Sequence, residues 1–215
     1  MKARTLKLVN SFFDSHRDLQ FLKQEILQAC ELVLNTYRNG GKLLICGNGG
    51  SSADSDHIVG ELMKGYQLQR PLDNSIKEKF KQCFGETGSK VAEKLQGSLP
   101  AISLSAHTAF NTAFINDVDC VLNYAQQVIG YANKSDAIIG ISTSGNSENV
   151  FYALMTGKVK GIKCIALTGK DGGKLASVAD CCLKVPAEDT YLIQEYHLAI
   201  YHFICAFVES EVFEK

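Results

Sequence analysis

The sequence predicts an α/β fold in which a parallel sheet lies between two layers of helices. Short apolar runs of strand length recur between residues 42 and 185, and the stretches that separate them have helical periodicity. Continuous apolar strands that alternate with helices are typical of a parallel sheet covered on both faces. The five runs are residues 42–46, 101–104, 137–141, 164–167 and 181–185. We therefore expect a three-layer α-β-α sandwich.

Helices are expected before, between and after these strands. Residues 1–40 have apolar positions at helical spacing and end at Asn39-Gly40-Gly41, which predicts two N-terminal helices and a turn. Residues 71–100 carry many lysines and glutamates around Phe80 and Phe84, which predicts an inserted helical surface segment; a solvated linker is the alternative. Residues 191–209 are apolar around most of a helical circumference, which predicts a long, buried final helix.

The composition fits one domain spanning residues 1–215. With 46% hydrophobic and 21% charged residues, the chain can bury a substantial core. The 22 basic and 23 acidic side chains leave a net charge of −1, which argues against a nucleic-acid partner. No apolar run reaches membrane-spanning length, so no membrane partner is expected. The eight cysteines lie mostly in apolar runs without a CxxC pair, which indicates buried free thiols and a cytoplasmic protein.

A glycine-rich turn follows the first strand, with the sequence Gly47-Asn48-Gly49-Gly50-Ser51. Such a turn between a strand and a helix exposes backbone N–H groups, which suit a bound anion or sugar hydroxyls. The spacing is not that of a dinucleotide-binding GxGxxG turn, and the lysine of a P-loop is absent. Dinucleotide and triphosphate binding are therefore disfavoured.

A hydroxyl-rich turn follows the third strand, and it contains Ser142, Thr143, Ser144, Gly145 and Ser147. Four hydroxyls at the start of a helix form a neutral set of donors for a phosphate monoester. The alternative is that Ser147 only caps the next helix, a role that needs a single hydroxyl. The number of hydroxyls favours phosphate binding.

Two pairs of polar residues on helices are further candidates. His57 and Glu61 are four residues apart after the glycine-rich turn, so they share one helix face. They could converge on a ligand or form an ordinary surface pair. Gln194 and His202 lie on the apolar final helix, where a polar group needs a partner or a cleft. They could equally be satisfied groups of the core.

These motifs together resemble the sugar isomerase (SIS) domain family, and within it the phosphoheptose isomerases. The resemblance also includes Asn116-Asp117, the loop of residues 166–173 and Ile193-Gln194-Glu195, and it runs in order along nearly the whole chain. It implies a five-stranded parallel sheet flanked by helices. It further implies a homotetramer whose active sites lie at subunit interfaces.

The resemblance implies a phosphorylated sugar as substrate and assigns roles to individual residues. The family converts sedoheptulose 7-phosphate to D-glycero-D-manno-heptose 7-phosphate for surface polysaccharide. The implied catalytic residues are Glu61 as base and His202 as acid, because a carboxylate and an imidazole suit a proton shift through an enediol. The implied zinc ligands are His57, Glu61, Gln194 and His202. The implied substrate-binding residues are Asn48, Gly49, Gly50, Ser51, Glu61, Asn116, Asp117, Ser142, Thr143, Ser144, Ser147 and Gln194.

Two features depart from the family pattern. Residues 71–100 are longer than the corresponding connection, and Tyr191 stands where the isomerases often carry an acidic residue. Two alternatives to heptose isomerisation follow. One is a noncatalytic SIS-fold scaffold like the replication-initiator-associating proteins, with residues 71–100 as its contact surface. The other is isomerisation of a different phosphosugar.

Overall fold

A computed structural model describes residues 1–214 and contains the expected parallel sheet. Its five strands are β1 (Leu43–Gly47), β2 (Ala101–Ser103), β3 (Ala137–Ser142), β4 (Lys163–Thr168) and β5 (Cys181–Lys184). All neighbours pair in parallel, in the order β2-β1-β3-β4-β5. The predicted fold class and strand positions are therefore confirmed.

The strand register brings two of the predicted motifs to the same edge of the sheet. Gly47 at the end of β1 is paired with Ile141 near the end of β3. The glycine-rich turn and the hydroxyl-rich turn therefore leave the sheet side by side. The strand order also reverses between β1 and β3, and ligands of open α/β sheets bind in the crevice at such a point.

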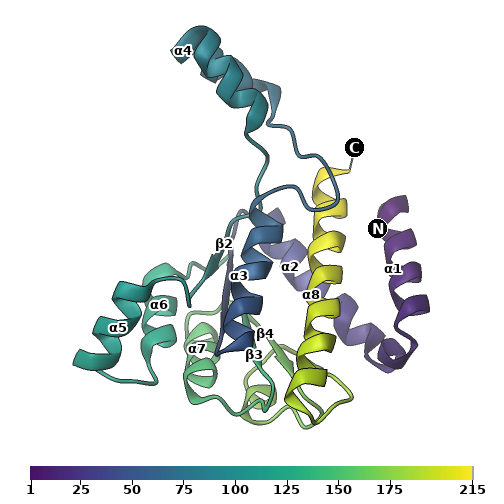
Figure 1. Ribbon diagram of the computed structural model, residues 1–215, viewed down its shortest axis with the longest axis vertical. Helices are drawn as coiled ribbons and strands as arrows, with labels where there is room; N and C mark the ends of the chain where they lie inside the picture. The colour runs from purple at the N-terminus through teal and green to yellow at the C-terminus, as the bar shows by residue number, and fades with distance from the viewer. Residues whose placement is uncertain (215) are drawn as a thin grey trace.

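Helices cover both faces of the sheet (Figure 1). On one face, Leu43 and Ile45 of β1 share a core with α1 (Ala3–Ser15), α2 (Lys23–Arg38), α3 (Gly50–Met63) and α8 (Thr190–Phe213). On the other face, Leu44 and Cys46 pack with α6 (Asn123–Tyr131) and α7 (Glu148–Val159). The alternation of neighbouring residues between two cores is the strand periodicity that a doubly covered sheet requires.

The terminal helices agree with the sequence predictions. A 3-10 segment, η1 (Arg17–Leu22), joins α1 to α2, and Gly40 follows α2 with a φ of 71°, the left-handed conformation that ends helices. The final helix α8 is buried along most of its length. No helix within residues 1–214 combines the length and the apolar character needed to cross a membrane.

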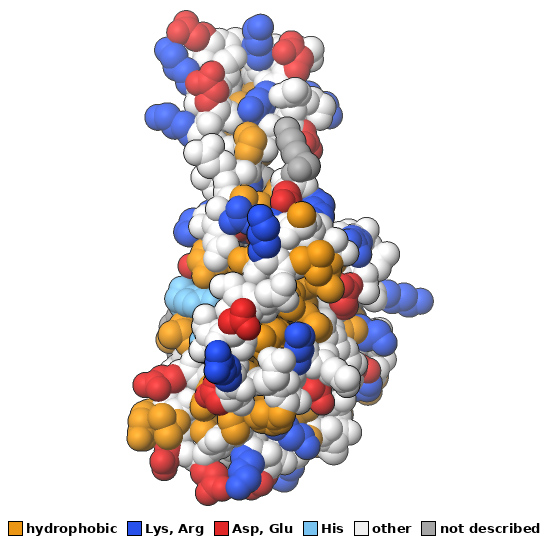
Figure 2. Space-filling model, turned by 90° about the vertical axis from the view of Figure 1, so that its right-hand side faces the viewer, with side chains coloured by type: hydrophobic (Ala, Val, Ile, Leu, Met, Phe, Trp, Pro, Cys, Tyr) orange, Lys and Arg blue, Asp and Glu red, His pale blue; other side chains and the backbone are white. Residues whose placement is uncertain are grey.

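Residues 71–100 form helix α4 (Asn74–Lys94) instead of an extended linker. The helix is broken at Gly85, whose φ of 58° and ψ of −136° reverse the chain. Gly88 then packs so tightly against Phe80 that a Cβ atom would lie 2.0 Å from its carbonyl oxygen. The resulting arm projects from the body, and at its base Pro71 pairs with Gln96 (Figure 1). Figure 2 shows acidic and basic side chains interspersed over one face of the body and of the arm.

All eight cysteines are free thiols, as predicted. Cys83 and Cys120 are exposed, Cys182 is half-buried and the other five are buried. Burial raises the pKa of Cys164 and of Cys181 to about 12. The buried cysteines therefore act as small apolar side chains.

Candidate active site

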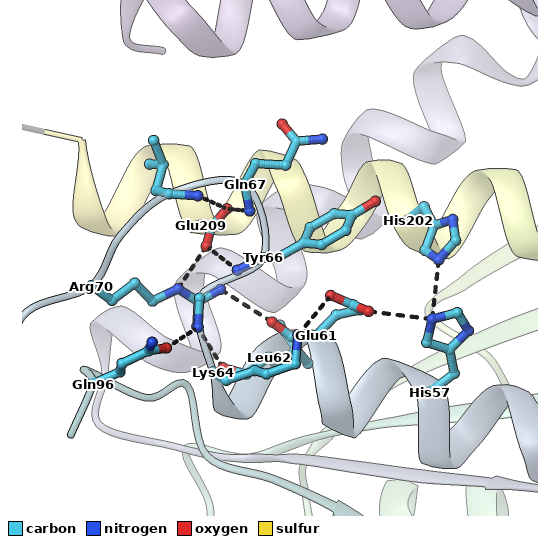
Figure 3. Close-up of polar contacts among 12 residues, drawn as sticks. His57, Glu61, Leu62, Lys64, Tyr66, Gln67, Arg70, Gln96, His202 and Glu209 are labelled. Atoms are coloured by element: carbon cyan, nitrogen blue, oxygen red, sulfur yellow. Dashed lines mark hydrogen bonds and ion pairs between the residues drawn. The ribbon is translucent and has the colours of Figure 1, made fainter. Parts of the chain in front are cut away.

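Helices α3 and α8 lie side by side and bring His57, Glu61 and His202 together (Figure 3). The Nε2 atom of His57 is 3.3 Å from Oε1 of Glu61 and 3.4 Å from Nε2 of His202. The first contact follows from the spacing of four residues on one helix, which places both side chains on the same face. The second joins residues that are 145 positions apart.

Two residues that sequence reasoning missed orient His57. The Tyr201 hydroxyl lies 2.8 Å from Nδ1 of His57 and donates to Oδ1 of Asp54 at 3.4 Å. The Tyr201 hydroxyl therefore lies between Asp54 and His57 and fixes the orientation of the imidazole ring, whose Nε2 faces Glu61 and His202. Burial raises the pKa of Asp54 and that of Tyr201. Their positions in the sequence were the one clue to this role, because Asp54 lies about one helical turn before His57 and Tyr201 is the neighbour of His202.

Glu61 keeps one oxygen free for a ligand. Its Oε2 atom is buried and has no hydrogen-bond partner among the described residues; the ammonium of Lys64 lies 3.8 Å away. Burial and the neighbouring His57 lower the pKa of His202, and Glu61 opposes that shift. The site therefore offers a carboxylate with an open position beside a neutral imidazole, a pair suited to proton transfer.

In the hydroxyl-rich turn at the start of α7, the hydroxyls of Ser144 and Ser147 contact the turn itself and not the backbone of the helix. Ser147 occupies the position that would cap α7, but its hydroxyl makes no bond to the helix. It contacts the hydroxyl of Ser142 instead, at 2.9 Å. Ser144 accepts a hydrogen bond from the Asn146 N–H group at 3.2 Å. The Ser147 hydroxyl therefore does not cap α7 in this conformation, and the third N–H group of the helix, that of Val150, donates instead to Oδ1 of Asn149 at 3.0 Å.

The loop after β4, which contains Gly172 and Gly173, packs against Gly145 of this turn. Gly145 has a φ of 66°, and a Cβ atom there would lie 2.2 Å from the Gly172 carbonyl oxygen. A Cβ atom on Gly173, whose φ is 51°, would lie 2.5 Å from the Gly145 carbonyl oxygen. That carbonyl also accepts a hydrogen bond from the Leu175 N–H group at 3.0 Å. The family motif of residues 166–173 thus has a structural role in shaping the hydroxyl-rich turn.

The glycine-rich turn is joined to the hydroxyl-rich turn by two amides. Asn48 and Asn149 each donate to the other, at 2.8 and 2.9 Å. Gly49 has a φ of 56°, and the next residue, Gly50, begins α3. The predicted substrate-binding residue Ser51 is buried beneath this turn. Asn149 was missed because it follows the hydroxyl motif and no residue pattern pairs it with Asn48.

Three predicted residues lie apart from His57, Glu61 and His202. Gln194 packs on Gly50, where a Cβ atom would lie 2.3 Å from its Nε2. That contact is about 10 Å along the α3 axis from His57. Asn116 and Asp117 contact each other at 2.8 Å on α5 (Thr108–Asp117), which buries none of its residues. Figure 1 shows α5 on the opposite side of the molecule from α8.

The predicted zinc ligands are not arranged around a common point. Within residues 1–214, no group of three or more His, Cys, Asp or Glu side chains is arranged to hold a metal ion. Glu61 and His202 each point at the same nitrogen of His57, so that nitrogen occupies the place between them. The donor types nevertheless suit zinc, since two imidazoles and an unpartnered carboxylate oxygen are among its usual ligands.

Comparisons with known proteins connect this geometry to a family. Models of the SIS domain match residues 15–98 and 105–206. The phosphoheptose isomerase of Helicobacter pylori strain P12 is 37% identical over 213 residues, which cover 97% of each chain. This chain belongs to the phosphoheptose isomerase family of SIS-domain proteins. The predicted resemblance is therefore confirmed.

Solved structures of the phosphoheptose isomerase family agree with the fold. The Neisseria gonorrhoeae phosphoheptose isomerase matches with a TM-score of 0.73 and 31% identity, covering 97% of this chain and 94% of that one. The Francisella tularensis enzyme matches with a TM-score of 0.75 and 30% identity, covering 98% and 100%. Both alignments extend over almost the whole of this chain.

Proposed function

We propose that the protein is a ketose-aldose isomerase that converts D-sedoheptulose 7-phosphate to D-glycero-D-manno-heptose 7-phosphate. The observation that carries the proposal is the buried, unpartnered Oε2 atom of Glu61 beside the His57–His202 contact. The match to phosphoheptose isomerases over nearly the whole chain supports the choice of substrate. The product would supply heptose for surface polysaccharide.

Substrate binding is assigned to the two turns at the carboxyl edge of the sheet. Ser142, Thr143, Ser144 and Ser147 would hold the phosphate with the N-terminal N–H groups of α7. Asn48, Gly49, Gly50 and Ser51 would contact the sugar chain together with Glu61 and Gln194. Asn116 and Asp117 would complete the pocket from another subunit. Because the phosphate ligands are neutral, the anion needs no basic patch on the surface.

Proton transfer is assigned to Glu61 and His202. After ring opening, Glu61 takes the proton from C1 while the C1–H electron pair forms a C1=C2 double bond and O2 gains a proton. His202 donates the proton that O2 gains and then takes one from the O1 hydroxyl; its pKa is lowered by burial and by His57, which favours the donation. Glu61 then returns its proton to C2 as O1 becomes the aldehyde oxygen. The reaction therefore moves hydrogen within one molecule and needs no external oxidant.

Zinc is proposed as a cofactor, one ion per subunit. The ligands would be His57, Glu61, Gln194 and His202, whose nitrogen and oxygen donors suit this metal. Binding would require these side chains to turn toward a common point, Gln194 from its position on Gly50. When bound, zinc would act as a Lewis acid that stabilises charge on the enediolate oxygens. Metal analysis of protein purified without chelator tests this, since a protein without stoichiometric zinc that is fully active would contradict it.

The proposed assembly is a cytoplasmic homotetramer of single-domain chains with active sites at subunit interfaces. Exposure of Asn116 and Asp117 on α5 supports it, because these residues could complete the site of another subunit. Light scattering coupled to size-exclusion chromatography gives the number of subunits. If the sites are shared, mixing Glu61→Gln chains with Asp117→Asn chains should restore part of the activity, whereas independent sites would gain none from the mixture.

The decisive experiment is NMR of sedoheptulose 7-phosphate incubated with the protein in D2O. Formation of the aldose with deuterium at C2 is the expected result. Smaller ketose phosphates in parallel samples test the alternative of a different phosphosugar. If none is converted while a known phosphoheptose isomerase converts the same sample, the noncatalytic scaffold is favoured.

A further inference from the structure

We propose that the buried ion pair of Arg70 and Glu209 is a positioning unit of the active site. It fixes the end of α3 that carries Glu61, and it fixes the segment that carries Tyr66 beside His202 (Figure 3). The inference rests on the proposed isomerase function, because it assigns Glu61 and His202 to the reaction. Neither Arg70 nor Glu209 follows from the motifs of the sequence.

Arg70 closes the C-terminal end of α3. Its guanidinium donates to the carbonyl oxygen of Leu62 at 2.6 Å and to that of Glu61 at 3.1 Å. The last carbonyl groups of a helix have no partner inside the helix; Arg70 supplies one to each of these two, and the Leu99 N–H group is a second donor to the Leu62 carbonyl at 3.0 Å. Arg70 is only 1% exposed. The backbone of the proposed base is therefore held directly by a buried cation.

Glu209 holds the chain that follows α3. Its carboxylate accepts hydrogen bonds from the N–H groups of Tyr66 at 2.8 Å, Gln67 at 2.7 Å and Leu68 at 3.1 Å. It also accepts from Nε of Arg70 at 2.7 Å. These residues lie outside any helix or strand, so Glu209 supplies backbone partners that secondary structure does not.

The network determines how the two catalytic side chains approach each other. Glu209 follows His202 by seven residues on α8, a spacing that places both on the same helix face. The Tyr66 ring, whose backbone N–H is bound by Glu209, lies with its centroid 5.8 Å from that of His202. The pair thus connects the proposed acid on α8 to the proposed base on α3.

A role limited to stability would not require this pair. Burying two charges has a large desolvation cost, and a well-packed apolar pair can be as stable. An apolar pair could not bind two helix carbonyls and three loop N–H groups at defined positions. The number and direction of these bonds point to precise placement, which catalysis needs because small displacements of reacting groups reduce the rate strongly.

The test uses Arg70→Lys and Glu209→Gln, with Asp136→Asn as matched control. Asp136 is also buried and holds a cation and two backbone N–H groups, but it lies at the opposite edge of the sheet, before β3. For both test variants we expect kcat to fall about tenfold or more while KM changes less than about threefold. The control should keep kcat within about twofold of wild type, even if its melting temperature falls equally.

Hydrogen exchange supplies a readout that does not depend on the substrate. In the wild type, the amides of Tyr66, Gln67 and Leu68 should exchange slowly although they lie in a loop. Glu209→Gln should speed their exchange, and Asp136→Asn should not. Rapid exchange of these amides in the wild type would overturn the inference even if neither test variant folds.

The possible failures are distinguishable. A wild type that does not isomerise sedoheptulose 7-phosphate contradicts the proposed function, whatever the variants do. An active wild type whose Arg70→Lys and Glu209→Gln variants keep the kcat of the control contradicts the positioning role alone. A fall in kcat shared equally by all three variants also contradicts it, since it would reflect lost stability.

Discussion

The Nε2 atoms of His57 and His202 face each other at 3.4 Å, although the two residues belong to different helices. Nitrogens this close cannot both carry protons without strong repulsion, so at least one imidazole must be neutral. Glu61 contacts the same His57 nitrogen at 3.3 Å. Three groups able to move or hold protons thus meet where α3 and α8 run side by side.

Replacing Glu61 by Gln should abolish isomerisation while leaving sugar phosphate binding intact. The amide cannot take the proton from C1, and loss of a general base lowers rates by about a hundredfold to ten-thousandfold. NMR in D2O measures turnover, and calorimetry measures binding. Glu188→Gln is the control, because Glu188 pairs with Lys170 on the exposed surface. Full activity of the Glu61→Gln variant would eliminate the proposed base.

Replacing Gly173 by Ala should weaken phosphate binding. The added Cβ atom would lie 2.5 Å from the Gly145 carbonyl oxygen and push the hydroxyl-rich turn out of shape. Gly161→Ala is a matched control, because its φ of 74° imposes similar backbone strain with no atom within 4 Å of the Cβ position. We expect the backbone strain to cost each variant about 1–3 kcal/mol of stability, with a further loss in Gly173→Ala from the clash. Only Gly173→Ala should raise KM, and equal KM values would refute the supporting role of the loop.

The stability of the fold should decrease in acid because of His197. This side chain is fully buried on α8, and burial lowers its pKa to about 4 from an ordinary value of 6.5. Between these two values the unfolded chain binds a proton that the folded chain does not. The contribution of about 3 kcal/mol is therefore complete above pH 6.5 and lost by pH 4. Urea unfolding at several pH values measures it.

A His197→Phe variant tests the assignment. Phenylalanine has no proton to gain, so the part of the pH dependence between 6.5 and 4 should diminish by about the same amount. His16→Phe is a suitable control, because His16 is half-buried and lies on the surface beside Phe12. An unchanged pH profile in His197→Phe would show that other groups cause the acid sensitivity.

Thiol reagents should distinguish two of the eight cysteines. Cys83 and Cys120 are exposed, whereas burial raises the pKa of Cys46, Cys164 and Cys205 and keeps these thiols protonated. Only a thiolate reacts rapidly. We expect two fast equivalents in the native protein and all eight after unfolding. Mass spectrometry of Cys83→Ser and Cys120→Ser variants assigns them, and rapid labelling of Cys46 would contradict the described burial.

The fold was predictable because its main elements are encoded locally. The apolar runs at β1, β3 and β4 are nearly free of polar residues, and all three strands are buried in the sheet. The apolar residues at helical spacing before Gly40 likewise form the helix faces that pack on the core. Such signals depend only on the spacing of residues along the chain, so a single sequence contains them.

The site was predictable only in part. The spacing of His57 and Glu61 placed them on one face, but nothing in the sequence placed Tyr201 against His57 or Glu209 against Arg70, which are 139 residues apart. Contacts between distant residues depend on how helices pack, and packing leaves no periodic pattern. The separation of Gln194 from His57 was missed for the same reason.

The bridge between Pro71 and Gln96 at the base of α4 has an evolutionary consequence. The Gly97 N–H group donates to the Arg70 carbonyl at 2.6 Å, so the two chain ends of the arm leave the body already joined. Segments of very different length can be accommodated between joined ends with little change in closure entropy. Lineages could therefore lengthen, shorten or exchange the arm without rebuilding the enzyme beneath it.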